Sequence, residues 1–411
     1  MKWWDDLWLN EGFATFMESI GTDEISDKHF RTKDYSLLSS LAAGLHEDEV
    51  ASSHPLSFQI DKATEVLEAF DSISYDKGAS VLAMLSAVIG EKTFKKAVTL
   101  GFPMVTAESL NETTVKITQK RYKINQKAEE QEKYRRPKHG FKWDIPLWYQ
   151  QSSEGEVKLT WLTRGTALVI KLHGFYRQNY DAKGWSHIIR QLHEDHEVYS
   201  ARTRNAIISD AFSAALIDEL DYETLFKLLE YSRNEDEYLP WEETMNGLIS
   251  ILEFFGNEAE SKLAKNYMRS IVKPIYDKAN IENLTSHYKD EKHFFQMNLQ
   301  QSAIDTFCKL DSRDCVAQQK AIFDRELVKK CEGGQMASEC VSWGADSSDA
   351  TFLFSVAAPL RSMVYCYGVK EGGDPAFNKV MELYKIERVQ LEKDRLLLAL
   401  GCHNDTAALK G

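Results

Sequence analysis

The sequence predicts a mixed, mostly α-helical fold in which a small β-sandwich separates two helical regions. Over the first hundred residues, apolar side chains recur at the helical period, for example at Trp8, Gly12 and Phe16. From about 105 to 172, apolar and polar residues alternate in short runs, which is typical of strands joined by turns. After about Trp185 the helical period returns and continues along the rest of the chain.

Individual elements follow from these periods. A further helix near the end of the first region is predicted by apolar residues at Val81, Leu82, Leu85 and Ile89. Strands are predicted at Thr114–Thr118 and Val157–Trp161, where residue types alternate, and in the apolar run Ala167–Ile170. The strongly charged stretch Gln126–Lys142 is expected to be a hairpin or a solvated loop.

The last region shows the spacing of buried helix faces. One expected helix has the i, i+3, i+4, i+7 pattern at Met245, Leu248, Ile249 and Leu252. Gly256 follows as its stop, and a helix at Leu225–Leu229 precedes a polar loop and Pro240. Successive helices of this kind predict a solenoid-like domain of the HEAT or armadillo type. We therefore expect three domains, over residues 1–100, 101–174 and 175–411.

Composition excludes several classes of protein. Hydrophobic residues make up 43% and charged residues 27%, which is ordinary for a folded soluble protein and excludes wholesale disorder. The longest nearly apolar stretch, Ala79–Gly90, is shorter than the roughly 20 residues that span a bilayer, so no membrane segment is expected in this chain. The opening residues Met1–Asp6 lack the pattern of a signal peptide. A net charge of -13 argues against a nucleic-acid partner.

No self-contained catalytic motif is present in the sequence. Walker, dinucleotide-binding and HExxH patterns are all missing from the 411 residues. The nearest pattern is His193-Glu194-Asp195-His196, in which two histidines could share a helix face and bind a metal ion. The alternative, a polar helix end, is the interpretation that we favour.

Residues Trp3–Ala14 read WWDDLWLNEGFA, and here the chain resembles the zinc aminopeptidases of the aminopeptidase N family, also called gluzincins. In that family, HExxH is followed by eighteen residues and then by the glutamate of WLNEGFA. The resemblance therefore makes Glu11 the third protein ligand of a zinc ion, beside two histidines and an open position for water. Without the resemblance, Glu11 would be interpreted as a surface glutamate at a helix start.

A second matching stretch, Phe70–Leu82, contains Tyr75 at the position of a family tyrosine. The resemblance implies that its hydroxyl donates to the oxyanion of the tetrahedral intermediate. Alone, Tyr75 would be interpreted as a core aromatic residue. Glu18 lies seven residues after Glu11 on the same helix face and is a candidate to support it, with an ordinary structural carboxylate as the alternative.

The resemblance extends over nearly the whole chain. It implies part of a thermolysin-like helical catalytic domain, then the sandwich, then a helical domain that ends early. The stretches that carry it are Gly101–Val105, Phe175–Asp181, Arg204–Phe212, Pro359–Ser362 and Tyr365–Gly368.

Cysteines and glycosylation sequons favour a secreted or extracellular location. In a continuous helix, Cys308 and Cys315 would lie about 10.5 Å apart, so a bridge requires a break at Asp311–Asp314. Extracellular members of the family carry a disulfide there, and the resemblance suggests a second bridge from Cys366 to Cys331 or Cys340. Asn-x-Thr sequons occur at Asn111, Asn283 and Asn404, of which Asn111 and Asn283 are our candidate glycosylation sites.

The departures from the family pattern are equally informative. Only ten residues precede Glu11, so both histidine ligands, the general base and the amine-binding loop are missing, and we expect an N-terminally truncated form. A second discontinuity is suspected at Leu100–Gly101. One carboxylate does not hold a catalytic zinc, so we expect this chain alone to be inactive. Trp3, Trp4 and Trp8 are expected to form an exposed apolar patch.

The resemblance implies a zinc-dependent aminopeptidase that releases single amino acids from peptides with a free N-terminus. The alternative is a non-catalytic truncated isoform or a scaffold that binds partners. An unrelated helical-repeat protein would not explain WLNEGFA. The parent protein is expected at the plasma membrane or secreted, with the cytoplasm as the alternative, and a homodimer through the helical domain is expected.

Overall fold

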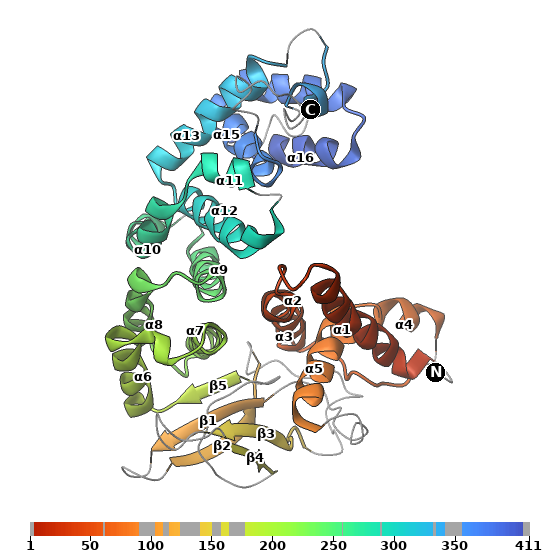
Figure 1. Cartoon of the computed structure of the whole chain (residues 1–411), viewed down its shortest axis with the longest axis vertical. Helices are drawn as coiled ribbons and strands as arrows, with labels where there is room; N and C mark the ends of the chain where they lie inside the picture. Colours follow the sequence, from red (N-terminus) through yellow and green to blue (C-terminus); the bar gives the residue numbers. More distant parts are fainter. Residues whose placement is uncertain are drawn as a thin grey trace. The chain divides into compact units, whose positions relative to one another are not determined.

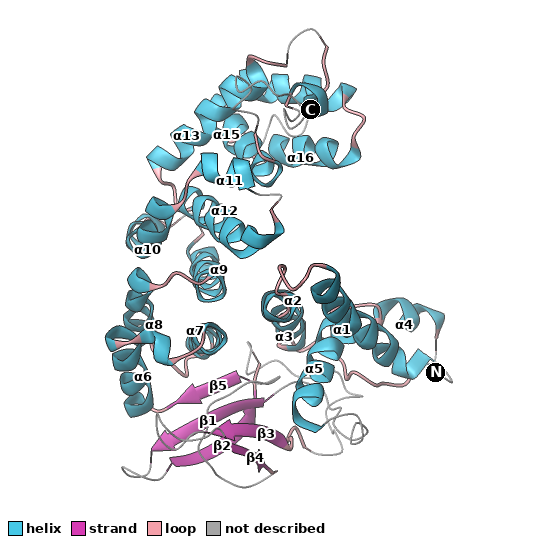
Figure 2. Cartoon of the chain, viewed as in Figure 1, coloured by secondary structure: helices cyan, strands magenta, loops and turns pink. Residues whose placement is uncertain are grey.

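The computed structural model describes residues 4–60, 62–89, 103–109, 115–123, 140–149, 158–163, 177–256, 258–287, 290–331, 334–341 and 356–405. The chain divides into two compact units, Met1–Gly247 and Leu248–Gly411 (Figure 1). Helices dominate both units, and the described strands all belong to the first (Figure 2). The predicted mostly α-helical class is confirmed.

The first unit opens with a group of helices. They are η1 (Trp4–Asp6), α1 (Leu7–Ile25), α2 (Thr32–Tyr35), η2 (Leu37–Leu41), α3 (Ala42–Asp48), α4 (Ala63–Glu68), η3 (Ile73–Lys77) and α5 (Gly78–Ile89). Helices α1 and α5, which pack against each other, confirm the helical periods predicted for both segments. The turn η3, which leads directly into α5, is π-helical. Such turns place side chains out of the ordinary helical register and are frequent at functional sites.

Two small sheets follow in the chain. Strands β1 (Pro103–Ser109), β2 (Val115–Arg121) and β5 (Arg177–Tyr180) form a three-stranded sheet in the order β2-β1-β5, with β1 antiparallel to β2 and parallel to β5. Strands β3 (Ile145–Tyr149) and β4 (Lys158–Leu162) form an antiparallel pair. Both sheets contribute to one apolar core, which consists of Val105, Ile117, Ile145 and Leu162. This shared core is the packing expected of a small sandwich.

The strands predicted at Thr114–Thr118 and Val157–Trp161 are confirmed as β2 and β4 to within a few residues. The predicted strand Ala167–Ile170 and most of the charged stretch Gln126–Lys142 lie outside the described residues.

The chain then turns helical, as predicted. The elements are α6 (Ala182–Glu194), η6 (His196–Val198), α7 (Ala201–Leu216), α8 (Tyr222–Leu229), η7 (Glu230–Asn234) and α9 (Tyr238–Phe255), which crosses the boundary between the units. Asp181 and Asp221 cap α6 and α8, each carboxylate accepting a backbone N–H at 2.7 Å. Gly256, with φ of 49°, ends α9 as predicted.

The family-like stretch Arg204–Phe212 begins with a buried ion pair. Arg204 donates to Glu235 through Nε at 2.6 Å and through Nη2 at 2.9 Å, and the Tyr231 hydroxyl donates to the same carboxylate at 3.1 Å. Glu235 also accepts the backbone N–H groups that precede α9. This arginine therefore joins α7 to the start of α9, which is a structural role.

The second unit continues as helices. They are α10 (Glu260–Lys278), α11 (Ile281–His287), η8 (Glu291–His293), α12 (Phe294–Lys309), α13 (Arg313–Phe323), η9 (Asp324–Val328), α14 (Ala337–Cys340), η10 (Ala358–Leu360), α15 (Arg361–Ile386) and α16 (Gln390–Leu400). Arg361 and Tyr365 on α15 bind the buried Glu392 on α16 at 3.0 and 2.6 Å. Among the helices described, none is long and apolar enough to cross a membrane.

The Cys308–Cys315 disulfide is confirmed. The chain breaks between α12 and α13, where Asp311 has a φ of 58°, and the two cysteine Cα atoms are 5.2 Å apart.

The prediction of a second bridge from Cys366 to Cys331 or Cys340 is wrong. Cys331 pairs with Cys340 because the short helix α14 brings these near neighbours together. Cys366 on α15 instead pairs with Cys402, which follows the antiparallel packing partner α16.

The sequons fall in different environments. Asn283 is half-buried in α11, whereas Asn404 is exposed and donates its side-chain amide to the Lys370 carbonyl at 2.8 Å. Asn111 lies outside the described residues.

Candidate active site

Glu11 and Tyr75, which the sequence singles out independently, lie in contact. Helix α1 packs against η3, which brings the Tyr75 hydroxyl to the Glu11 carboxylate, and both side chains are half-buried. Burial, followed by the hydrogen-bonding influence and the negative charge of Glu11, raises the pKa of Tyr75 above its ordinary value. The phenol therefore keeps its proton at neutral pH and remains a hydrogen-bond donor.

The contact depends on a close crossing of α1 and α5. A Cβ atom built on Gly12 would lie 2.8 Å from the carbonyl carbon of Gly78, a separation that real side chains do not adopt. Glycine at position 12 therefore lets the two backbones touch. This places Glu11, the preceding residue of α1, beside the turn η3 that carries Tyr75.

The turn η3 is fixed at its start by Asp71. One carboxylate oxygen accepts the Ser74 backbone N–H at 3.0 Å, and the other lies 2.8 Å from His54 Nε2. The His54 Nδ1 atom in turn lies 2.8 Å from the Pro55 carbonyl oxygen. Asp71 therefore links the turn to the loop that follows α3.

The end of η3 is fixed by a buried ion pair. Lys77 Nζ lies 2.6 Å from Asp48 Oδ2, and the side chains are only 3% and 0% exposed. The Ser53 hydroxyl donates to the other Asp48 oxygen at 2.6 Å. Nothing in the sequence marked Lys77, Asp48, Asp71 or His54 as site residues. The sequence around Lys77 includes Ser74, Asp76 and Ser80, so it gave no signal that the lysine is buried.

Aromatic side chains flank the contact. Trp4 and Phe70 have ring centroids 6.3 Å apart, and Phe70 and Tyr75 have theirs 6.4 Å apart. Trp4 packs beside a buried cluster composed of Leu7, Ile60 and Ala69.

The predicted exposed patch of Trp3, Trp4 and Trp8 is wrong for the two tryptophans that the structure describes. Trp8 is 7% exposed, because it packs at the crossing of α1 and α5, and Trp4 is half-buried. Trp3 lies outside the described residues. The exposed apolar side chains of α1 include instead Phe13 and Met17, at 40% and 55%.

The described residues alone do not fit a zinc ion. Within the ranges given above, no group of three or more His, Cys, Asp or Glu side chains could hold a metal ion. Glu11 offers one carboxylate, whereas a catalytic zinc takes about three protein ligands. Glu18 is exposed on α1.

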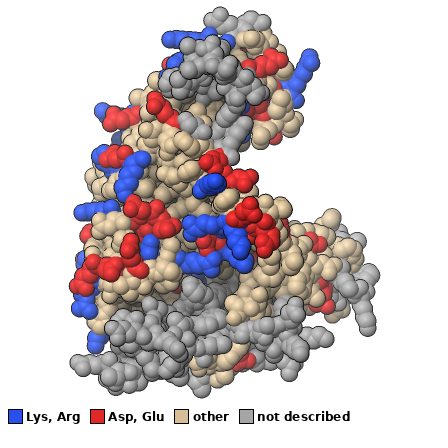
Figure 3. Space-filling view, viewed as in Figure 1, with Lys and Arg blue, Asp and Glu red and all other residues tan. Residues whose placement is uncertain are grey.

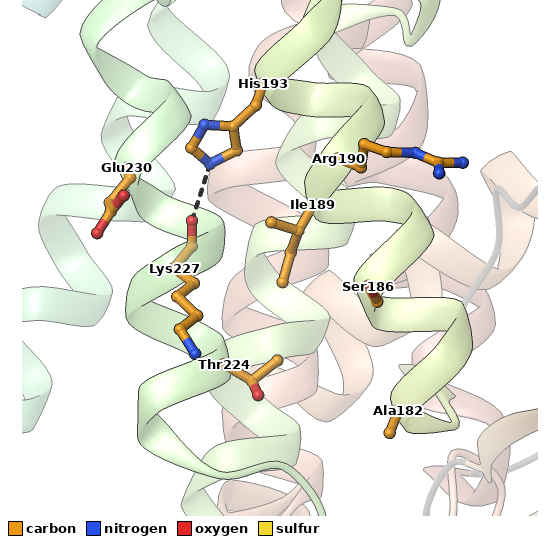
Figure 4. A pocket seen from close by; sticks show the side chains of 8 residues that line it. All are labelled: Ala182, Ser186, Ile189, Arg190, His193, Thr224, Lys227 and Glu230. Carbon is orange, nitrogen blue, oxygen red and sulfur yellow. Dashed lines mark hydrogen bonds between the residues drawn. The ribbon is translucent and has the colours of Figure 1, made fainter.

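The histidines of His193-Glu194-Asp195-His196 have structural partners. His193 Nε2 lies 3.1 Å from the Lys227 carbonyl oxygen, and the His196 ring lies 5.9 Å from that of Tyr231. Figure 4 shows His193 in a groove between α6 and α8 that also contains Arg190 and Glu230. This groove contains none of the predicted site residues. On the face drawn in Figure 3, acidic and basic side chains are intermixed.

A second buried polar cluster surrounds Arg177 on β5. Arg177 Nη1 lies 3.7 Å from Asp210 Oδ1 and also donates to the Ser209 hydroxyl. Burial, only partly offset by Arg177, raises the pKa of Asp210 to about 7. Burial also raises the pKa of Glu243 and that of Glu49, and the positive charge of Arg177 opposes both shifts. One guanidinium thus opposes the rise in pKa of three carboxyl groups.

The described chain thus has Glu11 and Tyr75 at a helix crossing, then two small sheets, then a long helical region, and family models match both ends of this arrangement. Residues 1–128 match the peptidase family M1 domain, and residues 170–411 match the ERAP1-like C-terminal domain. The chain belongs to the M1 peptidase family and carries its ERAP1-like C-terminal domain.

Individual relatives agree with this assignment. An aminopeptidase N of Haemonchus contortus is 49% identical over 471 aligned positions, which cover 100% of this chain and 47% of the relative. Glutamyl aminopeptidases of Rattus norvegicus and Homo sapiens are 26% and 27% identical, covering 100% and 98% of the chain and 45% and 44% of the relatives. The chain thus spans about half the length of these relatives. Because 471 positions align with only 411 residues, the Haemonchus protein has residues within this span that the chain lacks.

Proposed function

We propose that Glu11 and Tyr75 are this chain's contribution to a zinc aminopeptidase active site. In this proposal Glu11 is one ligand of the metal, and Tyr75 is the donor to the oxyanion that develops on the scissile carbonyl. The observation that carries the proposal is that the two side chains face each other where α1 packs against η3, so two residues from separate motifs meet at one point. The substrate class, peptides with a free N-terminus, is taken from the names of the relatives.

The chemistry of Tyr75 suits this role. A phenol that stays protonated donates to a forming oxyanion without giving up its proton, and its raised pKa favours that state. The neighbouring Glu11 carboxylate is the acceptor in the absence of substrate. With Glu11 engaged as a metal ligand, the Tyr75 hydroxyl would be available to donate to a substrate oxygen.

We propose that the chain alone is inactive, because it contributes one of about three protein ligands. Isothermal titration of the chain with zinc chloride should show no tight zinc-binding site that depends on Glu11, so the wild type and Glu11→Gln should give the same result. An aminoacyl anilide should not be hydrolysed by the chain. Chelator-sensitive hydrolysis by the purified chain would contradict this expectation.

The catalytic assignment requires a longer polypeptide from the same gene that includes an in-frame HExxH. There, Glu11→Gln should abolish zinc-dependent hydrolysis of the anilide. Tyr75→Phe should lower kcat by about 10²–10³-fold, the cost of removing one oxyanion donor, with little change in KM. A Tyr75→Phe variant with unchanged kcat would remove Tyr75 from the mechanism.

A non-catalytic isoform is the second candidate, and it is favoured by the single metal ligand among the described residues. Transcript sequencing upstream of Met1 separates the two. An in-frame HExxH supports the enzyme, whereas a start codon preceded by stop codons supports the isoform. The same transcripts test the suspected discontinuity at Leu100–Gly101.

We also propose that the protein folds in the secretory pathway, on the extracellular side or secreted. Support comes from three disulfides, which oxidising compartments favour, and from the sequons. Peptide mapping before and after glycosidase treatment, on protein from a secretory host, tests Asn111 and Asn283 directly. Fully reduced cysteines in the native protein would place it in the cytoplasm instead.

A further inference from the structure

Lys77 is a lysine in the protein interior. It ends η3, two residues after Tyr75, and its Nζ atom lies 2.6 Å from Asp48 Oδ2. Removing two charges from water is expensive, and their mutual attraction often does no more than offset that cost. The pair is therefore expected to contribute little to the free energy of unfolding. Its more important effect is that it fixes the position of η3 relative to α3.

The pair connects η3 to α3 at a point where the backbones already touch. Asp48 is the last residue of α3. A Cβ atom built on Gly44 of the same helix would lie 2.7 Å from the backbone nitrogen of Lys77. The Ser53 hydroxyl holds the other Asp48 oxygen at 2.6 Å, so the carboxylate has a fixed orientation. The end of η3 is thus fixed by both side-chain and backbone contacts.

Tyr75 lies between two fixed points of this turn. Asp71 accepts the Ser74 N–H at the start of η3, and Asp48 holds Lys77 at its end. Residues two apart on a helical turn point to different sides, so Lys77 is directed to α3 while Tyr75 meets Glu11. A shift of the turn along α3 would move the Tyr75 hydroxyl relative to Glu11.

We propose that Lys77 and Asp48 are positioning residues, whose buried ion pair places the Tyr75 hydroxyl against Glu11. The catalytic consequence rests on the proposed function, but the placement itself is measurable without catalysis. Because the ion pair joins the end of η3 to the end of α3, it acts on Tyr75 through the backbone of η3.

The test uses the double variant Asp48→Asn with Lys77→Met, which removes both charges and leaves no unpaired buried ion. The readout is the ¹³Cζ chemical shift of Tyr75 in the full chain, which reports hydrogen bonding of the phenol. Tyr75→Phe assigns the signal, and Glu11→Gln gives the shift expected when the carboxylate acceptor is lost. The matched control is Lys273→Met with Asp277→Asn, an exposed lysine–aspartate pair.

We expect the double variant to move the Tyr75 signal in the same direction as Glu11→Gln and by a comparable amount. The control pair should leave the signal unchanged. An unmoved signal in a folded double variant overturns the proposal. If the double variant does not fold, Ser53→Ala provides the second test, since it frees the Asp48 carboxylate while Lys77 is retained. It should move the signal in the same direction, and an unmoved signal again overturns the proposal.

Kinetics of the longer, HExxH-containing polypeptide separate this proposal from the proposed function. If both hold, the double variant lowers kcat by about 10²-fold, the cost of a misplaced group, with KM nearly unchanged. A moved Tyr75 signal with unchanged kcat supports the positioning role and removes Tyr75 from the mechanism. An unmoved signal with wild-type kinetics overturns the positioning role and leaves the proposed function intact.

Discussion

Asp210 should make the first unit less stable as the pH rises towards neutrality. Burial raises its pKa to about 7 in the folded state, against 3.8 as the ordinary value. Between these two values the folded protein binds more protons than the unfolded chain, so the free energy of unfolding falls as pH increases. At about 1.36 kcal/mol per pKa unit, the total loss is on the order of 4 kcal/mol and is complete about one pH unit above the folded-state pKa. The facing groups are Arg177, which opposes the shift, and Glu243, which adds to it.

The perturbation that tests this reasoning is Asp210→Asn, whose amide stays neutral at every pH. Urea unfolding followed by tryptophan fluorescence, at intervals from pH 5 to pH 8, gives the free energy of unfolding. Between pH 5 and 7, Asp210 should make the free energy of unfolding of the wild type fall by roughly 1.4 kcal/mol per pH unit. The Asp210→Asn variant should lack this contribution. Asp221→Asn is the control, because Asp221 is an exposed cap whose pKa is lowered, so it titrates below this window. Parallel curves for Asp210→Asn and wild type would refute the assignment.

Two further substitutions test the packing arguments. Gly12→Ala should destabilise the first unit by about 1–3 kcal/mol in urea unfolding, because the added Cβ atom meets the backbone of α5. Gly21→Ala is the control on the same helix. Its Cβ atom enters open space, so the variant should gain at most about 1 kcal/mol of stability. Equal effects would argue against a tight crossing. Arg204→Ala should cost about 3–5 kcal/mol, since Glu235 stays buried without its partner. Arg202→Ala removes an exposed arginine and should change stability by less than about 1 kcal/mol, so similar losses for both would count against the buried pair.

Periodicity in the sequence was sufficient to predict the architecture. The spacing of Trp8 and Gly12 predicted α1, the spacing of Met245 and Leu248 predicted α9, and the alternation at Thr114–Thr118 predicted β2. Such patterns are local, since each reports one face of one element. Disulfide pairing is not local. Cys366 pairs with Cys402 because α15 and α16 pack together, and nothing in the spacing of the cysteines indicates this packing.

The site was predictable only where a motif carried it. Glu11 and Tyr75 were singled out through family resemblance, and the roles inferred for them stay predictions. Lys77 and Asp48 were missed because an isolated lysine or aspartate in a sequence is almost always solvated. Burial of both charges becomes visible only when α3 and η3 are brought together. The exposure expected for Trp8 failed for the same reason, because its packing partner is far away in the sequence.

The WLNEGFA motif combines two different requirements in consecutive residues. Glu11 meets a chemical requirement, since its carboxylate faces the Tyr75 hydroxyl. Gly12 meets a geometric one, since any side chain there would collide with Gly78. Because α1 must touch α5 for Glu11 to reach Tyr75, a larger residue at position 12 would disturb the contact without changing either polar group. A match to this motif therefore predicts that α1 and α5 cross closely. It predicts the placement of Glu11 beside Tyr75 only because that crossing brings them together. Activity is a separate property, because it needs further metal ligands that the crossing does not supply.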